Sequence, residues 1–300
     1  MRFLFVDRIV ELVPGSLIRG IKHVTEDDNY LCKNEQGQYY FAASLIGETL
    51  GQLAAWNVMF TNDFTARPVA GIVASARLYR QAYLGETILL ESIIDSLDEQ
   101  AVQYHSIARI GSEVIFTVEG ALGPLLPMHQ FISNEEIQQQ FNEIYRPADW
   151  SAYQELSWLD LKEPVKQESI RLINLSFDKI IQHEPGVSMV AVKRISRSAP
   201  YFPDHFPHKP VLPMTVLLEC KLQLAHLFLQ EADFTSNFQV RELRKIKMSE
   251  FVYPGDILYC YVSLVQQDEQ QLILRFRSEV ESKRVCILDV IMTAKGISYE

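Results

Sequence analysis

A single histidine stands in a setting suited to proton transfer. His205 lies in the segment YFPDHFPHKPVLP, which covers residues 201–213 and leads directly into a predicted helix beginning at Met214. Four prolines restrict the backbone around it: Pro203, Pro207, Pro210 and Pro213. A restrained loop can hold an imidazole in one orientation, which general acid–base chemistry requires. We expect the other six histidines, including His208 in the same segment, to be structural or exposed.

Two glutamates occur on helices that are otherwise almost wholly apolar. Glu48 lies on a predicted helix over Ser44–Phe60, and Glu219 lies on one over Met214–Gln230. The free-energy cost of burying a carboxylate is on the order of several kcal/mol unless the group is paired or protonated. A carboxyl group in apolar surroundings has a raised pKa and can act as a general acid. At least one of these glutamates is therefore a candidate for function.

Simpler interpretations of the two glutamates fit less well. Their spacing from Ser44 and Thr215 is wrong for an N-terminal capping box. The carboxyl groups could also interact favourably with the positive end of the helix dipole. That interaction does not explain why apolar residues flank both glutamates. Gln52 and Gln223 follow four residues after the two acids, on the same helix faces, where each can hydrogen-bond and orient the carboxyl group.

The two glutamates are separated by 171 residues, and many other positions match at this offset. The matching pairs are Asp7/Asp178, Ile9/Ile180, Pro14/Pro185, Gly15/Gly186, Lys22/Lys193, Tyr30/Tyr201 and Ala54/Ala225. Turns of similar sequence, YLGE at 83–86 and YPGD at 253–256, follow at an offset of 170. This register predicts an internal duplication. At the position of His205 the first copy has Asn34, so only the second copy carries the histidine.

Each copy combines its long helix with segments of alternating polarity that predict antiparallel strands. The predicted strands are Thr87–Ile94, Val102–Ile110 and Glu113–Gly120 in the first copy, and Ile257–Val265, Gln271–Glu279 and Arg284–Thr293 in the second. The expected fold class is α+β, with a sheet wrapped around a central helix in each copy. The expected boundaries are 1–126 and 169–300 for the copies and 127–168 for a connector.

The connector has a helix-start signal at Ser133 and an amphipathic segment ending near Tyr145. Beyond it we expect an extended surface segment, and no chemistry in the connector. The residues that suggest this extended segment are Pro147, Trp150, Trp158 and Pro164.

Composition excludes several classes of function. A net charge of −10 argues against nonspecific nucleic-acid binding. The longest apolar candidate for a membrane span, Val211–Leu229, is interrupted by charged and polar residues, and the chain start lacks a signal-peptide pattern. Four scattered cysteines predict neither structural zinc nor a disulfide framework, and favour a cytoplasmic location. The cysteines are Cys32, Cys220, Cys260 and Cys286.

The segment PYFPDHFPHKPVLPMTVLLEC resembles the active-site segment of the β-hydroxyacyl-(acyl carrier protein) dehydratases, a hot-dog-fold family. FLFVDRIVELVPG resembles the amino-terminal segment of that family, and YPGD resembles its later turn. The resemblance implies a tandem (double) hot-dog fold. In the family, an active site takes histidine from one hot-dog and the acid from the other. One working site is therefore expected, formed by His205 and Glu48, while Glu219 opposite Asn34 is a relic or a structural acid.

The resemblance implies reversible syn dehydration of a (3R)-hydroxyacyl thioester to the trans-2-enoyl thioester. His205 would remove the α-proton, Glu48 would protonate the departing hydroxyl, and no metal or redox cofactor is needed. A backbone N–H at a helix start would polarise the thioester carbonyl. The substrate contacts expected are Met214, Pro213, Phe206 and Gln52.

Two positions depart from the family pattern, which has glycine at both. Met214 would narrow the acyl tunnel or change the substrate, and Asp204 would raise the pKa of His205 if it lies close. Two alternatives stay open. One is a hot-dog thioesterase in which Glu48 activates water and His205 positions the carbonyl, and the other is a non-catalytic acyl-thioester binding subunit.

The expected partner is an acidic acyl carrier protein or coenzyme A, either of which presents the acyl group on phosphopantetheine. A basic segment in VRELRKIKMSE is the candidate docking surface, with an ordinary solvated strand face as the alternative. Its residues are Arg241, Arg244, Lys245 and Lys247, with Arg77 and Arg80 in the first copy. Whether two such chains form a homodimer stays open.

Overall fold

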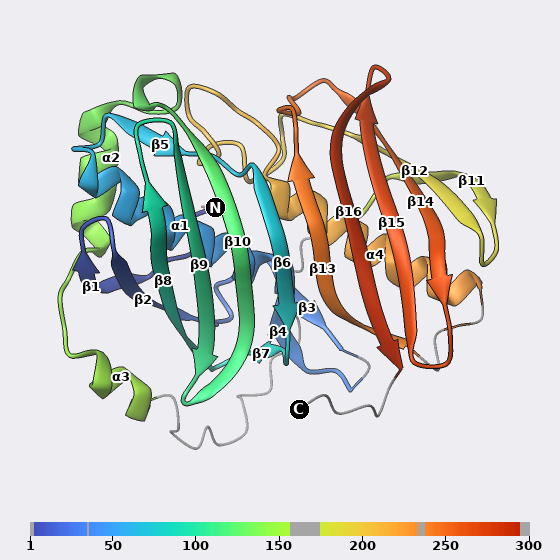
Figure 1. The fold of residues 1–300 in the computed structure, drawn as a ribbon, viewed down its shortest axis with the longest axis horizontal. Coiled ribbons are helices and arrows are strands. Elements are labelled where there is room, and N and C mark those ends of the chain that lie inside the picture. The colour runs from blue at the N-terminus through green and yellow to red at the C-terminus, as the bar shows by residue number, and fades with distance from the viewer. Residues whose placement is uncertain (1–2, 35, 157–174, 233, 235–237, 295–300) are drawn as a thin grey trace.

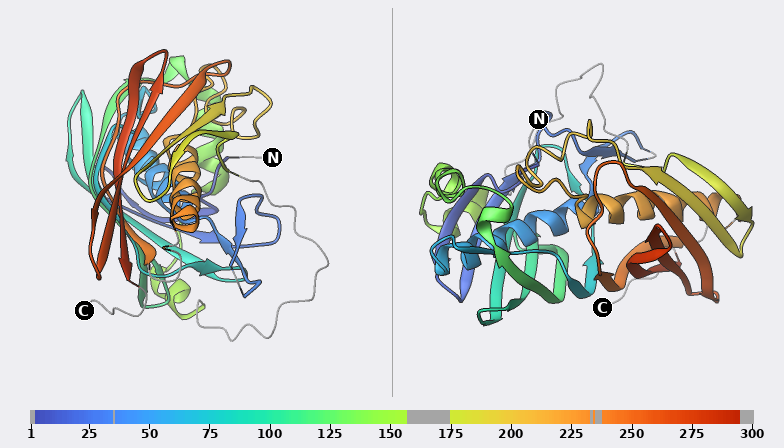
Figure 2. Two further views of the ribbon diagram at one scale, coloured as in Figure 1. Left: turned by 90° about the vertical axis from the view of Figure 1, so that its right-hand side faces the viewer. Right: turned by 90° about the horizontal axis from the view of Figure 1, so that it is seen from above.

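The two copies form one continuous antiparallel sheet with a long helix from each copy on the same face of it (Figures 1 and 2). A computed structural model describes residues 3–34, 36–156, 175–232, 234 and 238–294. The strand order is β1-β2-β8-β9-β10-β6 in the first copy and β13-β16-β15-β14-β12-β11 in the second. The second half of this order mirrors the first, as a duplication requires.

The elements recur at the offsets found in the sequence. In the first copy they are β1 Arg8–Val13, β2 Leu17–His23, α1 Ala43–Thr61, β6 Ile72–Leu78, β8 Thr87–Leu97, β9 Ala101–Ile110 and β10 Glu113–Pro127. In the second they are β11 Lys179–Glu184, β12 Ser188–Arg194, α4 Met214–Glu231, β13 Phe238–Met248, β14 Ile257–Gln267, β15 Gln271–Val280 and β16 Lys283–Ala294. The predicted helices and strands are therefore confirmed.

The sheets of the two copies join through β6 and β13. These strands pair antiparallel, with Ala76 opposite Leu243 and Val73 opposite Ile246. The join brings α1 and α4 into contact on the inner face of the sheet. Both helices are apolar on nearly all sides because each is covered by its own sheet and by the other copy. The core includes Leu45, Leu50, Val216 and Leu217, all without solvent exposure.

The two copies differ where the histidine-containing loop occurs. The first copy has a small sheet of β3 Leu31–Lys33, β4 Tyr39–Phe41 and β7 Ala82–Tyr83. The second copy has the irregular segment 195–213 in place of the β3–β4 hairpin. Asn34 lies in the hairpin turn, where its carbonyl accepts a hydrogen bond from the N–H of Gly37 (3.0 Å). The position of His205 is thus occupied by a turn residue in the first copy.

The connector contains the predicted helix and a further helix that the sequence did not predict. It starts with the short helix Met128–Gln130, and α2 Asn134–Ile144 follows. Just before it, the end of β10 pairs with β5 Ala66–Pro68 of the first copy. Ser133 caps α2 through the reciprocal hydrogen bonds of a capping box, as predicted.

The expectation of an extended segment after Pro147 is wrong at Trp150, because α3 Trp150–Leu156 begins there. Asp149 caps this helix by accepting a hydrogen bond from the N–H of Ser151 (2.9 Å). Arg8 donates to the Tyr153 hydroxyl (2.7 Å) and fixes α3 against β1. The predicted extended residues Trp158 and Pro164 lie outside the described residues. In the described part of the chain, no helix is long and apolar enough to cross a membrane.

Candidate active site

The loop around His205 fixes both the position and the tautomer of its imidazole. The backbone N–H of His205 donates to the carbonyl of Tyr201, and its own carbonyl accepts from Val211, both at 3.0 Å. Imidazole Nδ1 lies 3.0 Å from the carbonyl oxygen of Val211. Because a carbonyl can only accept, Nδ1 carries the proton in this contact. Nε2 of the neutral ring therefore keeps its lone pair and can act as a base.

The surroundings of His205 keep the imidazole neutral. Burial lowers its pKa below the ordinary value, and this outweighs the opposing attraction of the Glu48 carboxylate. The ring stacks on Phe206, with centroids 4.0 Å apart, and meets the ring of Phe3 edge-on at 5.9 Å. Burial is the largest cause of this downward shift in the pKa of His205, and the raising influence expected of Asp204 stays a prediction. Asp204 accepts a hydrogen bond from the N–H of Phe3 (2.6 Å).

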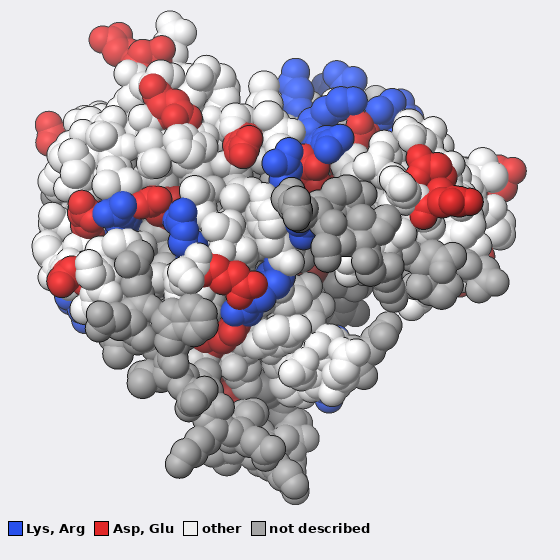
Figure 3. All heavy atoms as spheres, turned by 60° about the horizontal axis from the view of Figure 1, so that its bottom comes forward, with Lys and Arg blue, Asp and Glu red and all other residues white. Residues whose placement is uncertain are grey.

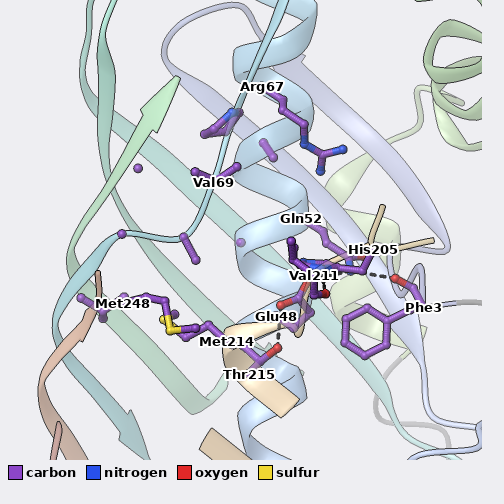
Figure 4. A pocket seen from close by; sticks show the side chains of 18 of the residues that line it. Phe3, Glu48, Gln52, Arg67, Val69, His205, Val211, Met214, Thr215 and Met248 are labelled. Carbon is purple, nitrogen blue, oxygen red and sulfur yellow. Dashed lines mark hydrogen bonds between the residues drawn. The ribbon is translucent and has the colours of Figure 1, made fainter. Parts of the chain in front are cut away.

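Glu48 reaches the same pocket from α1, in the other copy. Its carboxyl group accepts hydrogen bonds from the Thr215 hydroxyl on α4 (2.7 Å) and from the Gln52 amide (3.0 Å). The amide of Gln52 is itself held by the amino-terminal segment, since it accepts from the N–H of Phe5 and donates to the carbonyl of Phe3. These contacts fix the carboxyl group in one orientation beside His205 (Figure 4). Gln52 thus has the orienting role that its spacing predicted.

A matching arrangement surrounds Glu219, but without a histidine. The Ser44 hydroxyl on α1 donates to Glu219 at 2.7 Å, and the Gln223 amide donates at 3.1 Å. Glu219 is only 5% exposed. Burial and then the charge of Glu219 raise the pKa of Cys32 to about 12. The side chain of Asn34 hydrogen-bonds Gln38 in the hairpin turn. The position opposite Glu219 therefore has no imidazole base.

His205 and Glu48 share a cavity of about 170 Å³ between the two copies. Three of the predicted substrate contacts, Met214, Phe206 and Gln52, line it as well. Pro213 does not line this cavity; it immediately precedes α4, and its carbonyl accepts the N–H of Leu217 (3.2 Å). Met214 leaves the cavity open. Much of the wall is apolar, and includes Trp56, Met59, Phe116, Val118, Leu243, Ile246, Met248 and Phe251.

Sequence reasoning missed several residues of this pocket. Arg67 on β5 and Tyr104 on β9 line it, and so do Ile132, Ile137 and Gln140 of the connector. The connector thus forms part of the wall of the candidate site, a role that sequence reasoning did not predict, while the expectation of no chemistry in the connector stays a prediction. The apolar face of the amphipathic segment around Ile137 was the signal that could have indicated this. No comparable signal marks Arg67, whose importance depends on its surroundings.

The basic segment of β13 faces away from the pocket. Leu243, Ile246 and Met248 line the cavity, and strand alternation places Arg244 and Lys247 on the opposite face of the sheet. Lys and Arg side chains gather on the half of the molecule that the second copy forms (Figure 3).

Three of the four predicted docking residues already have partners. Arg244 pairs with Glu242 at 2.7 Å, Lys245 pairs with Asp289 at 3.3 Å, and Arg241 donates to the carbonyl of Leu78 at 3.0 Å. Their docking role stays a prediction. Among the described residues, no group of His, Cys, Asp and Glu side chains is arranged to hold a metal ion.

Comparison with known proteins identifies part of the chain directly. Residues 173–290 match the FabA-like domain. The 3-hydroxyacyl-(acyl-carrier-protein) dehydratase FabZ of Shewanella woodyi is 26% identical over 149 residues, which cover 48% of this chain and 98% of that protein. The corresponding enzyme of Shewanella loihica is 27% identical over 149 residues, covering 48% and 97%.

Solved structures match nearly the whole chain. The dehydratase domain of PpsC from Mycobacterium tuberculosis, in complex with C12:1-CoA, aligns with a TM-score of 0.54 and 11% identity over 96% of this chain and 98% of that chain. A putative oleoyl thioesterase from Lactobacillus plantarum aligns with a TM-score of 0.55 and 9% identity over 94% and 99%. At such identities these structures establish the fold alone.

The fold and the matches define a double hot-dog protein, as the sequence predicted. Residues 173–290, in its second half, match the FabA-like domain, and about half of the chain is distantly similar to the FabZ dehydratases.

Proposed function

We propose that the protein is a dehydratase of (3R)-3-hydroxyacyl thioesters that forms trans-2-enoyl thioesters in fatty-acid or polyketide-like biosynthesis. One observation carries this proposal. A buried imidazole with a free Nε2 and an oriented carboxyl group line the same, largely apolar cavity, and each comes from a different copy. The FabZ relatives bear the name of this reaction, which supports the choice.

The pair has the groups that the elimination needs. Nε2 of His205 takes the proton from C2, the C–H electron pair forms the C2=C3 bond, and the C3–O bond breaks. The hydroxyl leaves as water with a proton from Glu48. In this proposal the pair holds one transferable proton before the step, on Glu48, in addition to the proton on Nδ1 of His205. After the step Glu48 has lost its proton to water, and Nε2 of His205 carries the proton from C2. Return of that proton from the imidazolium to the carboxylate restores the starting state.

The start of α4 offers a donor for the thioester carbonyl. Met214 is the first residue of this helix and lines the cavity. The N–H groups of a first helical turn have no partner within the helix, and the helix dipole adds a partial positive charge there. A carbonyl oxygen near Met214 would be polarised as C2 loses its proton, which lowers the barrier to that step.

The substrate would be carried on phosphopantetheine, from either an acyl carrier protein or coenzyme A. The coenzyme A complex of the PpsC dehydratase domain concerns that protein, but it illustrates that this fold accepts such a carrier. The cations of β13 are the proposed docking surface: Arg241, which is half-buried, and Arg244, Lys245 and Lys247, which are exposed. Glu242 and Asp289 partly neutralise them, so we assign them a modest, salt-sensitive contribution.

Incubation of the pure protein with a 3-hydroxyacyl thioester tests the proposal. We expect the absorbance of the conjugated enoyl thioester to rise without release of free thiol. Free thiol without enoyl product would instead establish the thioesterase alternative, in which Glu48 activates water. Binding with neither product would establish a non-catalytic acyl-thioester binding subunit. Running the reaction from the enoyl thioester provides a control, because a dehydratase also catalyses hydration.

A further inference from the structure

Arg67 is a cation in the candidate site that has no role in the elimination described above. It lies on β5, lines the cavity and projects in Figure 4 toward the side where Gln52 and His205 lie. We propose that Arg67 binds the substrate by donating a hydrogen bond from its guanidinium to a carbonyl oxygen of the bound acyl thioester. This inference rests on the proposed function, since it assumes that an acyl thioester occupies the pocket.

The first support is that the Arg67 guanidinium has no hydrogen-bond or ion-pair partner among the described residues. Its Nε atom is buried and has no hydrogen-bond partner. No carboxylate of the described residues lies within ion-pairing distance of its guanidinium, whereas seven other described arginines form ion pairs with acids. Those seven are Arg19, Arg77, Arg80, Arg109, Arg244, Arg275 and Arg277. A buried donor without a partner is costly, so a ligand that supplies an acceptor gains more there than at an already paired arginine.

The second support is that Arg67 is held in place relative to the base. The guanidinium carbon lies 3.9 Å from the ring centroid of Phe206 and 5.6 Å from that of Phe131. The same Phe206 ring stacks on the imidazole of His205 at 4.0 Å. Stacking on an aromatic face leaves the N–H groups of a planar guanidinium free to donate at its edge. Phe206 thus links the proposed base and the proposed substrate-binding cation.

The third support is that Arg67 is charged and acts on both proposed catalytic groups. Burial lowers its pKa to about 10, opposed by the attraction of Glu48, so that it remains protonated at neutral pH. Its charge is also one of the influences that lower the pKa of His205. Arg67 therefore lies close enough to the imidazole of His205 and to the carboxyl group of Glu48 to interact electrostatically with both. In the proposed reaction, C2 and C3 of the substrate lie between these two groups.

The proposed mechanism assigns the 3-hydroxyl of the substrate to Glu48, which leaves carbonyl oxygens as the acceptors for Arg67. The alkyl part of the chain has no acceptor, and it fits the apolar part of the wall near Met214 and Met248, on another side of Glu48 from Arg67 in Figure 4. Apart from the 3-hydroxyl, the acceptors nearest to C2 are the thioester carbonyl oxygen and, beyond sulfur, the first amide carbonyl of pantetheine. Both are neutral carbonyls, and the experiment distinguishes them.

The test is equilibrium binding of two unreactive coenzyme A derivatives to the wild-type protein and to Arg67→Met. One is a ketone analogue, in which a methylene separates sulfur from the carbonyl carbon, and the other is the S-alkyl derivative without that carbonyl. Loss of a charged donor is expected to weaken binding about 10- to 100-fold. Weakening of the ketone alone assigns the thioester oxygen, and equal weakening of both assigns the pantetheine amide. Unchanged binding of both ligands overturns the inference.

Controls separate a substrate contact from a structural effect. Arg277→Met is matched, because Arg277 also covers an aromatic ring (Tyr261, 4.8 Å) but does not line the pocket, and its binding should stay unchanged. Arg67→Lys keeps the charge, and its affinity for the derivatives should lie between that of the wild type and that of Arg67→Met. If the methionine variant fails to fold, the affinity of the lysine variant alone tests whether Arg67 contacts the ligand. If the wild-type protein binds neither derivative, the same two groups are presented on an acyl carrier protein. Absence of binding there as well means that the proposed function fails, which is distinct from equal binding by wild type and variant.

A second readout depends on charge rather than packing. Because the Arg67 cation disfavours a proton on the imidazole, Arg67→Met should raise the pKa of His205. The acidic limb of the kcat/KM profile should then move to higher pH, and Arg67→Lys should leave the limb near its wild-type position. An unmoved limb in the methionine variant would contradict the placement of a charged Arg67 beside the base.

Discussion

At the scale of single residues, chemistry in this protein depends on which partner each side chain has. Glu48 and Glu219 have the same helix position, the same type of hydroxyl donor from the other copy and the same glutamine four residues on. They differ in what lies opposite. Glu48 shares its cavity with His205, whereas the residue corresponding to that histidine in the first copy, Asn34, bonds within its own hairpin. Duplication has kept two acids but supplied one base.

This difference leads to a direct test by substitution. His205→Ala and Glu48→Gln should each reduce dehydration by roughly 100- to 10,000-fold, the usual contribution of a positioned general acid or base. Glu219→Gln is the matched control and should retain most of the activity. Steady-state rates for the three purified variants provide the measurement. A severe loss in Glu219→Gln with a mild loss in Glu48→Gln would reverse the cross-copy assignment.

The protonation of His205 sets the expected pH dependence. The imidazole acts as a base only when neutral, and burial holds its pKa below the ordinary value near 6.5. Activity should therefore fall on acidification only below about pH 6.5. The pH profile of kcat/KM measures this limb in the free enzyme. A limb above pH 7 would mean that the Glu48 carboxylate, rather than burial, controls this histidine.

The candidate site was predictable from sequence only in part. The proline-rich loop identified His205, and a charge on an apolar helix identified Glu48. The hydroxyl of Thr215 and the cation of Arg67 carry no such local mark, because their importance arises from contacts between segments distant in sequence. A buried arginine without a partner can be recognised only when its surroundings are known.

At the scale of elements, α4 contains a feature that α1 lacks. Lys221 is fully buried, and its described hydrogen-bond partner is the thiol of Cys286, with Nζ and Sγ 3.0 Å apart. The corresponding residue of α1 is Leu50, which is also fully buried. Burial of an amine that pairs with no carboxylate of the described residues has a desolvation cost, for which a thiol compensates only weakly. We therefore expect Lys221 to destabilise the second copy relative to a leucine at this position.

We expect Lys221→Leu to raise the free energy of unfolding by about 1–3 kcal/mol, because it removes that desolvation cost and restores the residue type of the first copy. Urea denaturation monitored by circular dichroism gives the measurement. The reciprocal change, Leu50→Lys, is the control and should destabilise the protein by more than about 3 kcal/mol. A loss of stability in Lys221→Leu would show that Lys221 has a favourable partner in the core of the second copy.

The elements themselves were largely predictable, and the exceptions have local causes. Periodicity and the repeated register located α1, α4 and three strands in each copy. The β3–β4 hairpin was missed because its strands have only three residues each, too few to show alternation. Helix α3 was missed because the prolines and tryptophans of its segment suggested an extended chain. The helix forms there with Asp149 as its cap.

At the scale of the whole molecule, the site exists because the two copies share one sheet. Sequence reasoning predicted a site with residues from both copies but did not predict that β6 and β13 would pair at their edges. Edge pairing depends on which strands are left unpaired in each copy, and that follows from the complete topology. The pairing brings β13 next to β6 at the pocket, which residues of α1 also line. There Leu243 and Ile246 form part of the wall.

An acidic residue strengthens this junction between the copies. Glu242 on β13 is 5% exposed and accepts hydrogen bonds from the Ser75 hydroxyl on β6 (2.6 Å) and from Arg244 (2.7 Å). Arg77 on β6 lies 3.3 Å from the same carboxylate. Burial alone would raise the pKa of Glu242, but the hydrogen bonds from Arg244 and Ser75 together with the nearby cations outweigh it and lower the pKa below the ordinary value. Ionised Glu242 thus stabilises the folded state.

The pH dependence of this stabilisation has a definite sign. A carboxyl group whose pKa is lower in the folded state contributes stability above its unfolded pKa, about 4.3, and loses it as pH falls through the folded pKa. Glu242→Gln should therefore lower the free energy of unfolding by about 1–3 kcal/mol at pH 7. The difference from the wild type should narrow below about pH 4. Urea titrations at pH 7 and pH 3 measure both values, with the exposed Glu269→Gln as control. An equal difference at the two pH values would mean that Glu242 supports the junction by packing and not by its charge.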